Sequence, residues 1–180
     1  MNPAHVLILP GWQNSGPAHW QSRWEAAHGY VRVQQHDWER PLRGDWLMQL
    51  EEAVLKFDEP VILVAHSLGC IQVAAWAAHS QNTNRVKAAL LVAPGDVERD
   101  DMRALLPGWS PIARQRLPFR SVLVVSRDDP HCAFDKALSL ARDWGAELVD
   151  IGKAGHINAD SGLGDWPQGH ELLRRLQELN

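Results

Sequence analysis

Short hydrophobic runs alternate along the chain with longer segments in which hydrophobic residues recur every three or four positions. The runs have the length of β-strands, and they span residues 5–10, 31–37, 61–67, 86–94, 121–129 and 146–152. Four of them are almost continuously apolar and do not alternate with polar positions. This pattern is typical of strands that are covered on both faces, as in a parallel sheet.

The longer segments predict helices, and they span residues 17–29, 45–57, 68–80, 134–145 and 169–179. Gly29 is placed to end the first helix, and Asp45 is a candidate N-cap of the second. Strands that alternate with helices indicate an α/β fold, in which a doubly wound, mostly parallel sheet carries helices on both faces. The 180 residues contain no repeat, linker or low-complexity segment, so we expect a single domain over residues 1–180.

Composition and charge narrow the class of protein. The 18 Lys and Arg residues are outnumbered by 22 Asp and Glu residues, which argues against a nucleic-acid partner. The two cysteines, Cys70 and Cys132, have no metal-binding spacing and fit a reducing compartment. The N-terminal hydrophobic run is too short for a signal peptide, and no stretch is long enough to span a membrane. We therefore expect a cytoplasmic protein without a membrane partner, and the sequence leaves its oligomeric state open.

The segment "VILVAHSLGC" (61–70) ends a hydrophobic run in a serine flanked by small residues. A serine hydroxyl becomes a good nucleophile when a base takes its proton, and a sharp strand-to-helix turn exposes its oxygen at a helix N-terminus. Such a turn crowds the positions two before and two after Ser67, which are Ala65 and Gly69. The usual G-x-S-x-G pattern thus reads A-H-S-L-G here. A purely structural turn built from Ser and Gly is the alternative interpretation.

Ligands of open α/β sheets bind beyond the carboxyl ends of the strands, and two later loops at such ends supply an acid and a base. The acid is Asp128 or Asp129, which local physical chemistry does not distinguish. The base is His156, in a glycine-containing loop, with His131 as the alternative. Together with Ser67 these residues follow the chain order Ser–Asp–His of a hydrolase triad.

Backbone N–H groups would have to stabilise the oxyanion formed in such a reaction. One candidate is the N–H of Leu68, directly after the serine. The other is the N–H of Trp12 in the loop "PGWQNSG" (10–16), where Gly11 allows unusual backbone angles that free this N–H to point inward. A glycine loop that only turns the chain is the alternative interpretation.

These motifs resemble those of the α/β-hydrolase superfamily, and more narrowly the small, lidless serine hydrolases related to retinoblastoma-binding protein 9. The resemblance is carried by "ILPGWQNSGPAHWQSRWE" (8–25), "VILVAHSLGC" (61–70), "VLVVSRDDP" (122–130) and "GHIN" (155–158). It implies a six-stranded sheet in the order 2-1-3-4-5-6 and selects Asp129, the aspartate directly before proline, as the acid. His19, Trp20 and Trp24 correspond to the His-Trp pair and later Trp of that family. Ala65 departs from the common glycine and bears on the geometry of the turn.

The predicted function is that of a serine hydrolase, carboxylesterase-like, which cleaves small ester or amide substrates through an acyl-enzyme on Ser67. It requires no metal and no organic cofactor. Trp109, in the irregular stretch 94–118, and Trp20 are candidates for the substrate cleft. A thioesterase or amidase with the same triad, or a non-catalytic binding module on this scaffold, is the alternative. A dinucleotide-dependent oxidoreductase is disfavoured because no G-x-G-x-x-G follows the first strand.

Overall fold

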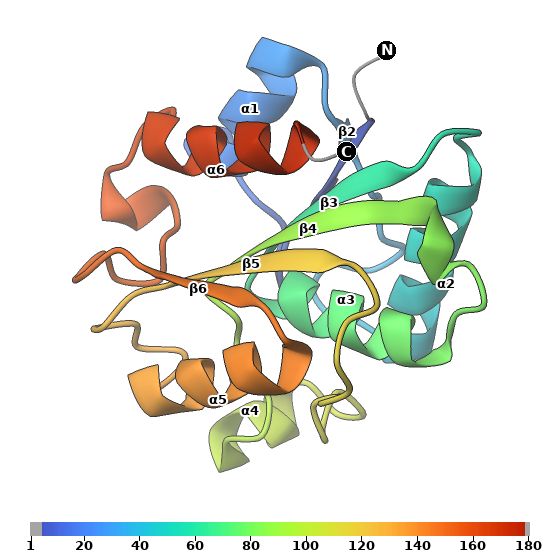
Figure 1. Ribbon diagram of the computed structural model, residues 1–180. Helices are drawn as coiled ribbons and strands as arrows, with labels where there is room; N and C mark the ends of the chain where they lie inside the picture. Colours follow the sequence, from blue (N-terminus) through green and yellow to red (C-terminus); the bar gives the residue numbers. More distant parts are fainter. Residues whose placement is uncertain (1–4, 179–180) are drawn as a thin grey trace.

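A parallel sheet forms the centre of the molecule in the computed structural model, which describes residues 5–178 (Figure 1). Its strand order is β2-β1-β3-β4-β5-β6, and all neighbouring pairs are parallel. The strands are β1 (Val6–Leu9), β2 (Val31–Arg32), β3 (Val61–His66), β4 (Val86–Val92), β5 (Arg120–Val125) and β6 (Glu147–Asp150). The sequence-based expectation of an α/β fold with this strand order is confirmed.

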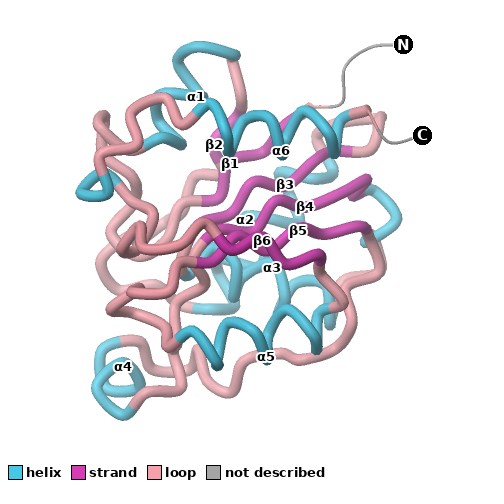
Figure 2. The backbone as a smooth tube through the Cα atoms, turned by 60° about the vertical axis from the view of Figure 1, so that its left-hand side comes forward, coloured by secondary structure: helices cyan, strands magenta, loops and turns pink. Residues whose placement is uncertain are grey.

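Helices cover both faces of the sheet, as Figures 1 and 2 show. Helices α1 and α6 lie on one face, and α2, α3 and α5 lie on the other. The α-helices are α1 (Trp20–His28), α2 (Arg43–Leu55), α3 (Leu68–His79), α4 (Asp100–Leu105), α5 (Phe134–Trp144) and α6 (Pro167–Gln177). Two 3₁₀ turns, η1 (Thr83–Arg85) and η2 (Ala159–Ser161), complete the described elements.

Two hydrophobic cores flank the sheet because alternate residues of a strand point to opposite faces. Val6 and Ile8 of β1 belong to the core with α1 and α6, whereas Leu7 and Leu9 belong to the core with α2, α3 and α5. All four side chains are almost fully buried. The continuous apolar runs of the sequence therefore arise from strands that are buried on both sides.

The register of the strands brings their carboxyl ends to one edge of the sheet. Leu9 pairs with Ala65, and His66, the next residue of β3, pairs with Val92. Val125 pairs with Asp150 at the end of β6. Long loops gather at this edge in Figure 2, so the segments that follow β1, β3, β4, β5 and β6 meet there.

Several local expectations differ from the structure. Helix α2 begins two residues earlier than expected, its N-cap is Leu42, and Asp45 lies in its first turn. The prediction of Asp45 as N-cap is wrong; a carboxylate in the first turn still interacts favourably with the helix dipole. Strand β2 pairs over only two residues of the run 31–37. The irregular stretch 94–118 contains the short helix α4.

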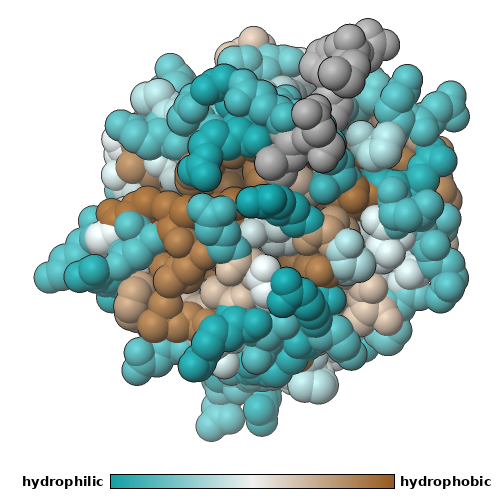
Figure 3. Space-filling view, viewed as in Figure 1, coloured by the Kyte–Doolittle hydropathy of each residue, from teal (hydrophilic) through white to brown (hydrophobic). Residues whose placement is uncertain are grey.

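The surface around β6 differs from the helical surfaces of the molecule. Figure 3 shows hydrophobic side chains gathered near the β5–β6 edge, whereas the neighbouring helices present mainly hydrophilic residues. Leu148 is 39% exposed and belongs to β6, the edge strand of the sheet that residues 5–178 form. Within residues 5–178, no helix has both the length and the apolar character that crossing a membrane requires.

Candidate active site

Ser67 lies on a tight turn between β3 and α3. Its backbone angles are φ 55° and ψ −120°, a conformation that non-glycine residues rarely adopt and that often marks a functional site. Gly69 makes the turn possible, because a Cβ atom there would lie 2.4 Å from the carbonyl oxygen of Leu9. Ala65 is fully buried on the other side of the turn. The crowding that the pentapeptide predicts is therefore present, and the methyl group of Ala65 fits.

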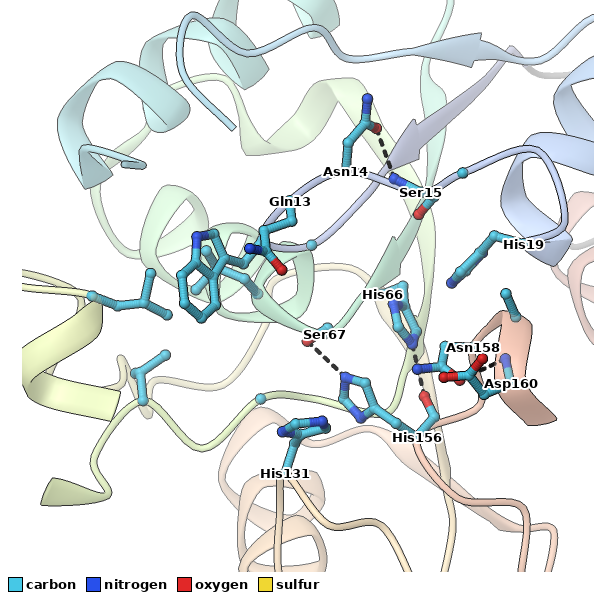
Figure 4. A pocket seen from close by; sticks show the side chains of 18 of the residues that line it. Gln13, Asn14, Ser15, His19, His66, Ser67, His131, His156, Asn158 and Asp160 are labelled. Carbon is cyan, nitrogen blue, oxygen red and sulfur yellow. Dashed lines mark hydrogen bonds between the residues drawn. The ribbon is translucent and has the colours of Figure 1, made fainter. Parts of the chain in front are cut away.

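Three side chains from separate loops form a hydrogen-bonded chain at this turn, and Figure 4 shows its link between Ser67 and His156. His156 Nε2 lies 2.9 Å from Ser67 Oγ, and His156 Nδ1 lies 2.9 Å from each carboxylate oxygen of Asp129. The side chains of His156 and Asp129 are only 10% and 4% exposed. Because the carboxylate can only accept, Nδ1 carries the proton and Nε2 is free to accept the hydroxyl proton. The geometry is that of a nucleophile, a base and an orienting acid.

The structure separates the two aspartates that local sequence did not. Asp128 is exposed and accepts hydrogen bonds from the Gly155 N–H, at 2.9 Å, and from the Ser126 hydroxyl, at 2.8 Å. These two hydrogen bonds lower the pKa of Asp128. Asp128 thus supports the loop that carries His156, whereas Asp129 contacts the imidazole itself. This placement agrees with the aspartate that the family resemblance selects.

His131, the alternative base, is exposed and stacks edge-on against His156, with 4.5 Å between ring centroids. Its backbone N–H donates to Asp129 at 2.8 Å. Within residues 5–178, Ser67 Oγ has its hydrogen bond with His156 and none with His131. The structure therefore places His156, and not His131, in position to act on the serine.

The two expected oxyanion donors, the N–H groups of Leu68 and Trp12, lie in the loops around Ser67. Leu68 is the first residue of α3, where N–H groups have no partner within the helix. Gly11 is required for space: a Cβ atom there would lie 2.8 Å from Ser67 Cβ and 3.2 Å from the Leu68 nitrogen. Gly11 itself has no positive φ angle; the positive φ angles of this loop occur at Gln13 and Asn14.

A cavity of about 360 Å³ opens beside Ser67. Its walls differ in chemistry. An apolar wall is formed by Trp12, Leu68, Val97, Met102 and Leu106. A polar wall, made by His19, Asn158 and Asp160, lies on the side of His156.

Trp109 and Trp20 do not line this cavity. Trp109 is fully buried, packs edge-on against Trp46 and donates its indole N–H to the Pro41 carbonyl oxygen. Trp20, the first residue of α1, is buried and donates its indole N–H to the carbonyl oxygen of Ile157. Both cleft expectations are wrong for the same reason: a large ring that finds a partner for its N–H packs well inside a core. Trp12 is the tryptophan that borders the cavity.

Two histidines that sequence reasoning left without a role surround the triad. His66 precedes Ser67, and its Nε2 lies 2.8 Å from the His156 carbonyl oxygen, to which it must donate. His19 is the N-cap of α1, and its ring lies 4.7 Å from that of His66. Burial lowers the pKa of His66 well below its usual value and that of His19 to about 4, so both are neutral at physiological pH. The sequence indicated these two histidines only by their positions: His66 directly precedes Ser67, and His19 directly precedes Trp20, in the motifs quoted above.

Further hydrogen bonds hold the loop around His156. The Ala154 N–H donates to the Ser126 hydroxyl at 2.9 Å, and the Ser161 hydroxyl donates to the Ala154 carbonyl at 2.6 Å. Trp20 holds the backbone on the other side of His156, through Ile157. The loop is thus fixed by polar contacts from three separate parts of the chain.

Cys70 lies one helical turn behind Ser67 and is fully buried. Its thiol donates weakly to the carbonyl oxygens of Val92 and Ala65, at 3.4 and 3.6 Å. Burial raises the pKa of Cys70, and it raises the pKa of Cys132 to about 12. Both thiols are therefore protonated and unreactive at neutral pH.

Comparison with known proteins agrees with this geometry. The model of a family described as serine hydrolase matches residues 6–175. The chain belongs to this serine hydrolase family. The match confirms the resemblance to serine hydrolases, whereas the narrower relation to retinoblastoma-binding protein 9 stays a prediction. A search of curated proteins gave no match.

Solved structures of similar fold are α/β hydrolases. A YdeN-like hydrolase from Pectobacterium atrosepticum is 29% identical with a TM-score of 0.85, and the alignment covers 98% of this chain and 91% of that one. The ydeN gene product from B. subtilis is 22% identical with a TM-score of 0.76, covering 96% and 98%. Est1E from Butyrivibrio proteoclasticus, solved with ferulic acid, is 14% identical with a TM-score of 0.69, covering 98% and 92%.

Proposed function

We propose that this serine hydrolase cleaves small esters through an acyl-enzyme on Ser67. The observation that carries the proposal is the hydrogen-bonded chain from Ser67 through His156 to Asp129, at 2.9 Å for each step. The cavity beside it is near the lower end of the range for small-molecule sites, about 300–1,000 Å³, and so favours a small substrate. One solved structure of similar fold is esterase 2 from Thermogutta terrifontis, which supports an ester substrate.

In the first half of the reaction, His156 Nε2 takes the Ser67 hydroxyl proton while the oxygen bonds to the substrate carbonyl carbon. The N–H groups of Trp12 and Leu68 donate to the oxyanion. Asp129 stabilises the imidazolium that forms and keeps its Nδ1–H in place. His156 then gives the proton to the leaving alcohol as the carbon–oxygen bond breaks.

In the second half, water attacks the acyl-enzyme. His156 takes a proton from the water as its oxygen bonds to the acyl carbon. It returns that proton to Ser67 Oγ as the acyl–serine bond breaks. The products are the acid and the free enzyme, so no metal or cofactor is needed for the cycle.

Covalent labelling tests the nucleophile. A fluorophosphonate should label the wild-type protein, and Ser67→Ala should lose the label together with up to ~10⁶-fold of kcat. Ser139→Ala, on α5 away from the cavity, is the matched control and should keep both. Thermal unfolding checks that Ser67→Ala still folds. Labelling that persists in Ser67→Ala, or a folded wild type without label or hydrolysis, would refute the proposal and favour a binding module.

A series of p-nitrophenyl esters tests the size of the substrate. We expect kcat/KM to reach its maximum at or below a four-carbon acyl chain, because each further methylene gains ~0.8 kcal/mol only where an apolar wall covers it. The apolar wall ends within a cavity of about 360 Å³. A steady rise to ten or twelve carbons would show a long acyl channel and contradict the small-substrate proposal.

A further inference from the structure

The polar wall of the cavity has no role in the mechanism above, although it lies directly beside the triad. His19 contributes a buried side chain, of which only 5% is exposed. As N-cap of α1, its Nδ1 accepts the backbone N–H of Gln21 at 3.1 Å. Because burial lowers the pKa of His19 to about 4, the ring is neutral and its single proton sits on Nε2.

The Nε2–H donor of His19 is buried and has no hydrogen-bond partner within residues 5–178. An unsatisfied buried donor costs about 1–3 kcal/mol, so its presence in a binding cavity calls for a ligand that satisfies it. Figure 4 shows the ring pointing from the end of the β1 loop towards His66 and the cavity.

Asn158 presents a second donor, because here too one side-chain atom caps a helix and leaves the other free. It is the N-cap of η2, and its Oδ1 accepts the backbone N–H of Asp160 at 3.1 Å. The capping bond fixes the amide orientation, so its NH₂ group is the end turned towards His66 and the cavity in Figure 4. The N-cap residues of α1 and η2, His19 and Asn158, therefore both present donors to the polar wall.

A wall with two donors favours a ligand that carries a hydrogen-bond acceptor. Asp160 limits the charge that this acceptor can have. The carboxylate of Asp160 is exposed at the same wall and disfavours an anionic ligand such as a carboxylate or phosphate. The acceptor that fits is a neutral oxygen, as in a carbonyl, ether or hydroxyl group.

The position of the polar wall assigns it to one side of the scissile bond. The ring of His66 lies 4.8 Å from that of His156, and His19 packs against His66. His156 must protonate the leaving group, so the leaving group lies on this side. The apolar wall, on the side of Trp12 and Leu68, is left for the acyl group.

We propose that the polar wall is a leaving-group subsite, in which His19 and Asn158 bind a neutral oxygen carried by the alcohol portion of the substrate. The inference rests on the proposed function and adds the substrate class: a short apolar acyl group esterified to an oxygen-bearing alcohol. His19 and Asn158 are specificity-determining residues in this proposal.

Two butyrate esters of equal length test it. In 2-methoxyethyl butyrate an ether oxygen replaces one methylene of n-butyl butyrate. After correction for their rates of alkaline hydrolysis, kcat/KM of the wild type should favour the methoxyethyl ester by about 3- to 10-fold, the range for one neutral hydrogen bond. The preference should be the same at pH 5.5 and pH 8, because His19 stays neutral over that range.

Two variants withdraw one donor each from the wall, because the new side chain is shorter, and both retain a capping acceptor. His19→Asn and Asn158→Ser both introduce good N-cap residues, and each should move the preference towards 1, by no more than the about 3- to 10-fold that the wild type shows. Met102→Leu on the apolar wall is the matched control, and its ratio between the two esters should equal that of the wild type. Thermal unfolding identifies a variant that does not fold, in which case the other variant decides.

The outcomes separate this proposal from the one on which it rests. A wild type that hydrolyses both esters without preference, or variants whose ratio is unchanged, would show that water or the His66 ring satisfies the His19 donor, and would overturn the subsite alone. Absence of both hydrolysis and fluorophosphonate labelling would overturn the subsite together with the proposed function.

Discussion

The turn that carries Ser67 and the loop that carries His156 reach the same hydrogen bond by different means. The turn is held by lack of space, since Gly69 lies directly against the carbonyl oxygen of Leu9. The loop is held by hydrogen bonds to its backbone from Ser126, His66 and other residues distant in sequence. A sterically fixed turn depends on a few small residues and on the strand packed against them. A loop fixed by polar contacts depends on the whole fold, so the two should respond differently to substitution.

The largest expected effect lies in the segment between β5 and α5, where two aspartates contact the loop of His156 in different ways. Asp129→Asn should lower kcat by about 10⁴-fold, because an amide in that place can favour the wrong tautomer of His156. Asp128→Asn is the matched control, and its loss should be far smaller because Asp128 supports the backbone of Gly155. Steady-state kinetics of both variants measures this. If Asp128→Asn proved the more damaging, the assignment of the acid would be reversed.

A substitution in the turn that carries Ser67 should lower the stability of the folded protein. Gly69→Ala places a methyl group 2.4 Å from a backbone oxygen, and the sheet and α3 must separate to relieve the clash. We expect the free energy of unfolding to fall by at least about 3 kcal/mol, the upper range for overpacking. Gly44→Ala in α2 has no atom within 4 Å and should raise stability by roughly 0.5–1 kcal/mol. Urea unfolding compares them, and equal stabilities would show that the turn has room to relax.

The smallest expected effect concerns the contact between the two regions. His66 lies in the turn and donates to the carbonyl oxygen of His156 in the loop. His66→Phe removes the donor and should lower kcat by about 10- to 100-fold with little change in KM, since the base is less well oriented. His66→Gln retains a donor and should recover part of kcat. If both variants had the same kcat, the hydrogen bond would not position the base.

The same contrast explains how far the sequence could predict the molecule. The strands and Ser67 were predictable because buried strands and a crowded turn leave local patterns in the sequence. The order of the strands was predictable through the family resemblance. Asp128 and Asp129 could not be separated by local rules, since their difference lies in which loop atom each one meets. Trp109 was misplaced because sequence cannot show that Pro41 accepts its N–H. His19 and His66 acquire their roles only through contacts across the fold.

The surroundings of Cys70 and Cys132 determine how the protein reacts with thiol reagents. Both thiols of the chain are buried and protonated, although one of them lies a single helical turn from the reactive serine. Maleimides and iodoacetamide need an accessible thiolate, so they should spare this protein in its native state. A cysteine introduced at an exposed position would then be the one site for a fluorophore or a tether. Ser67 would remain available to its own electrophiles, and the two modifications could be made independently on one molecule.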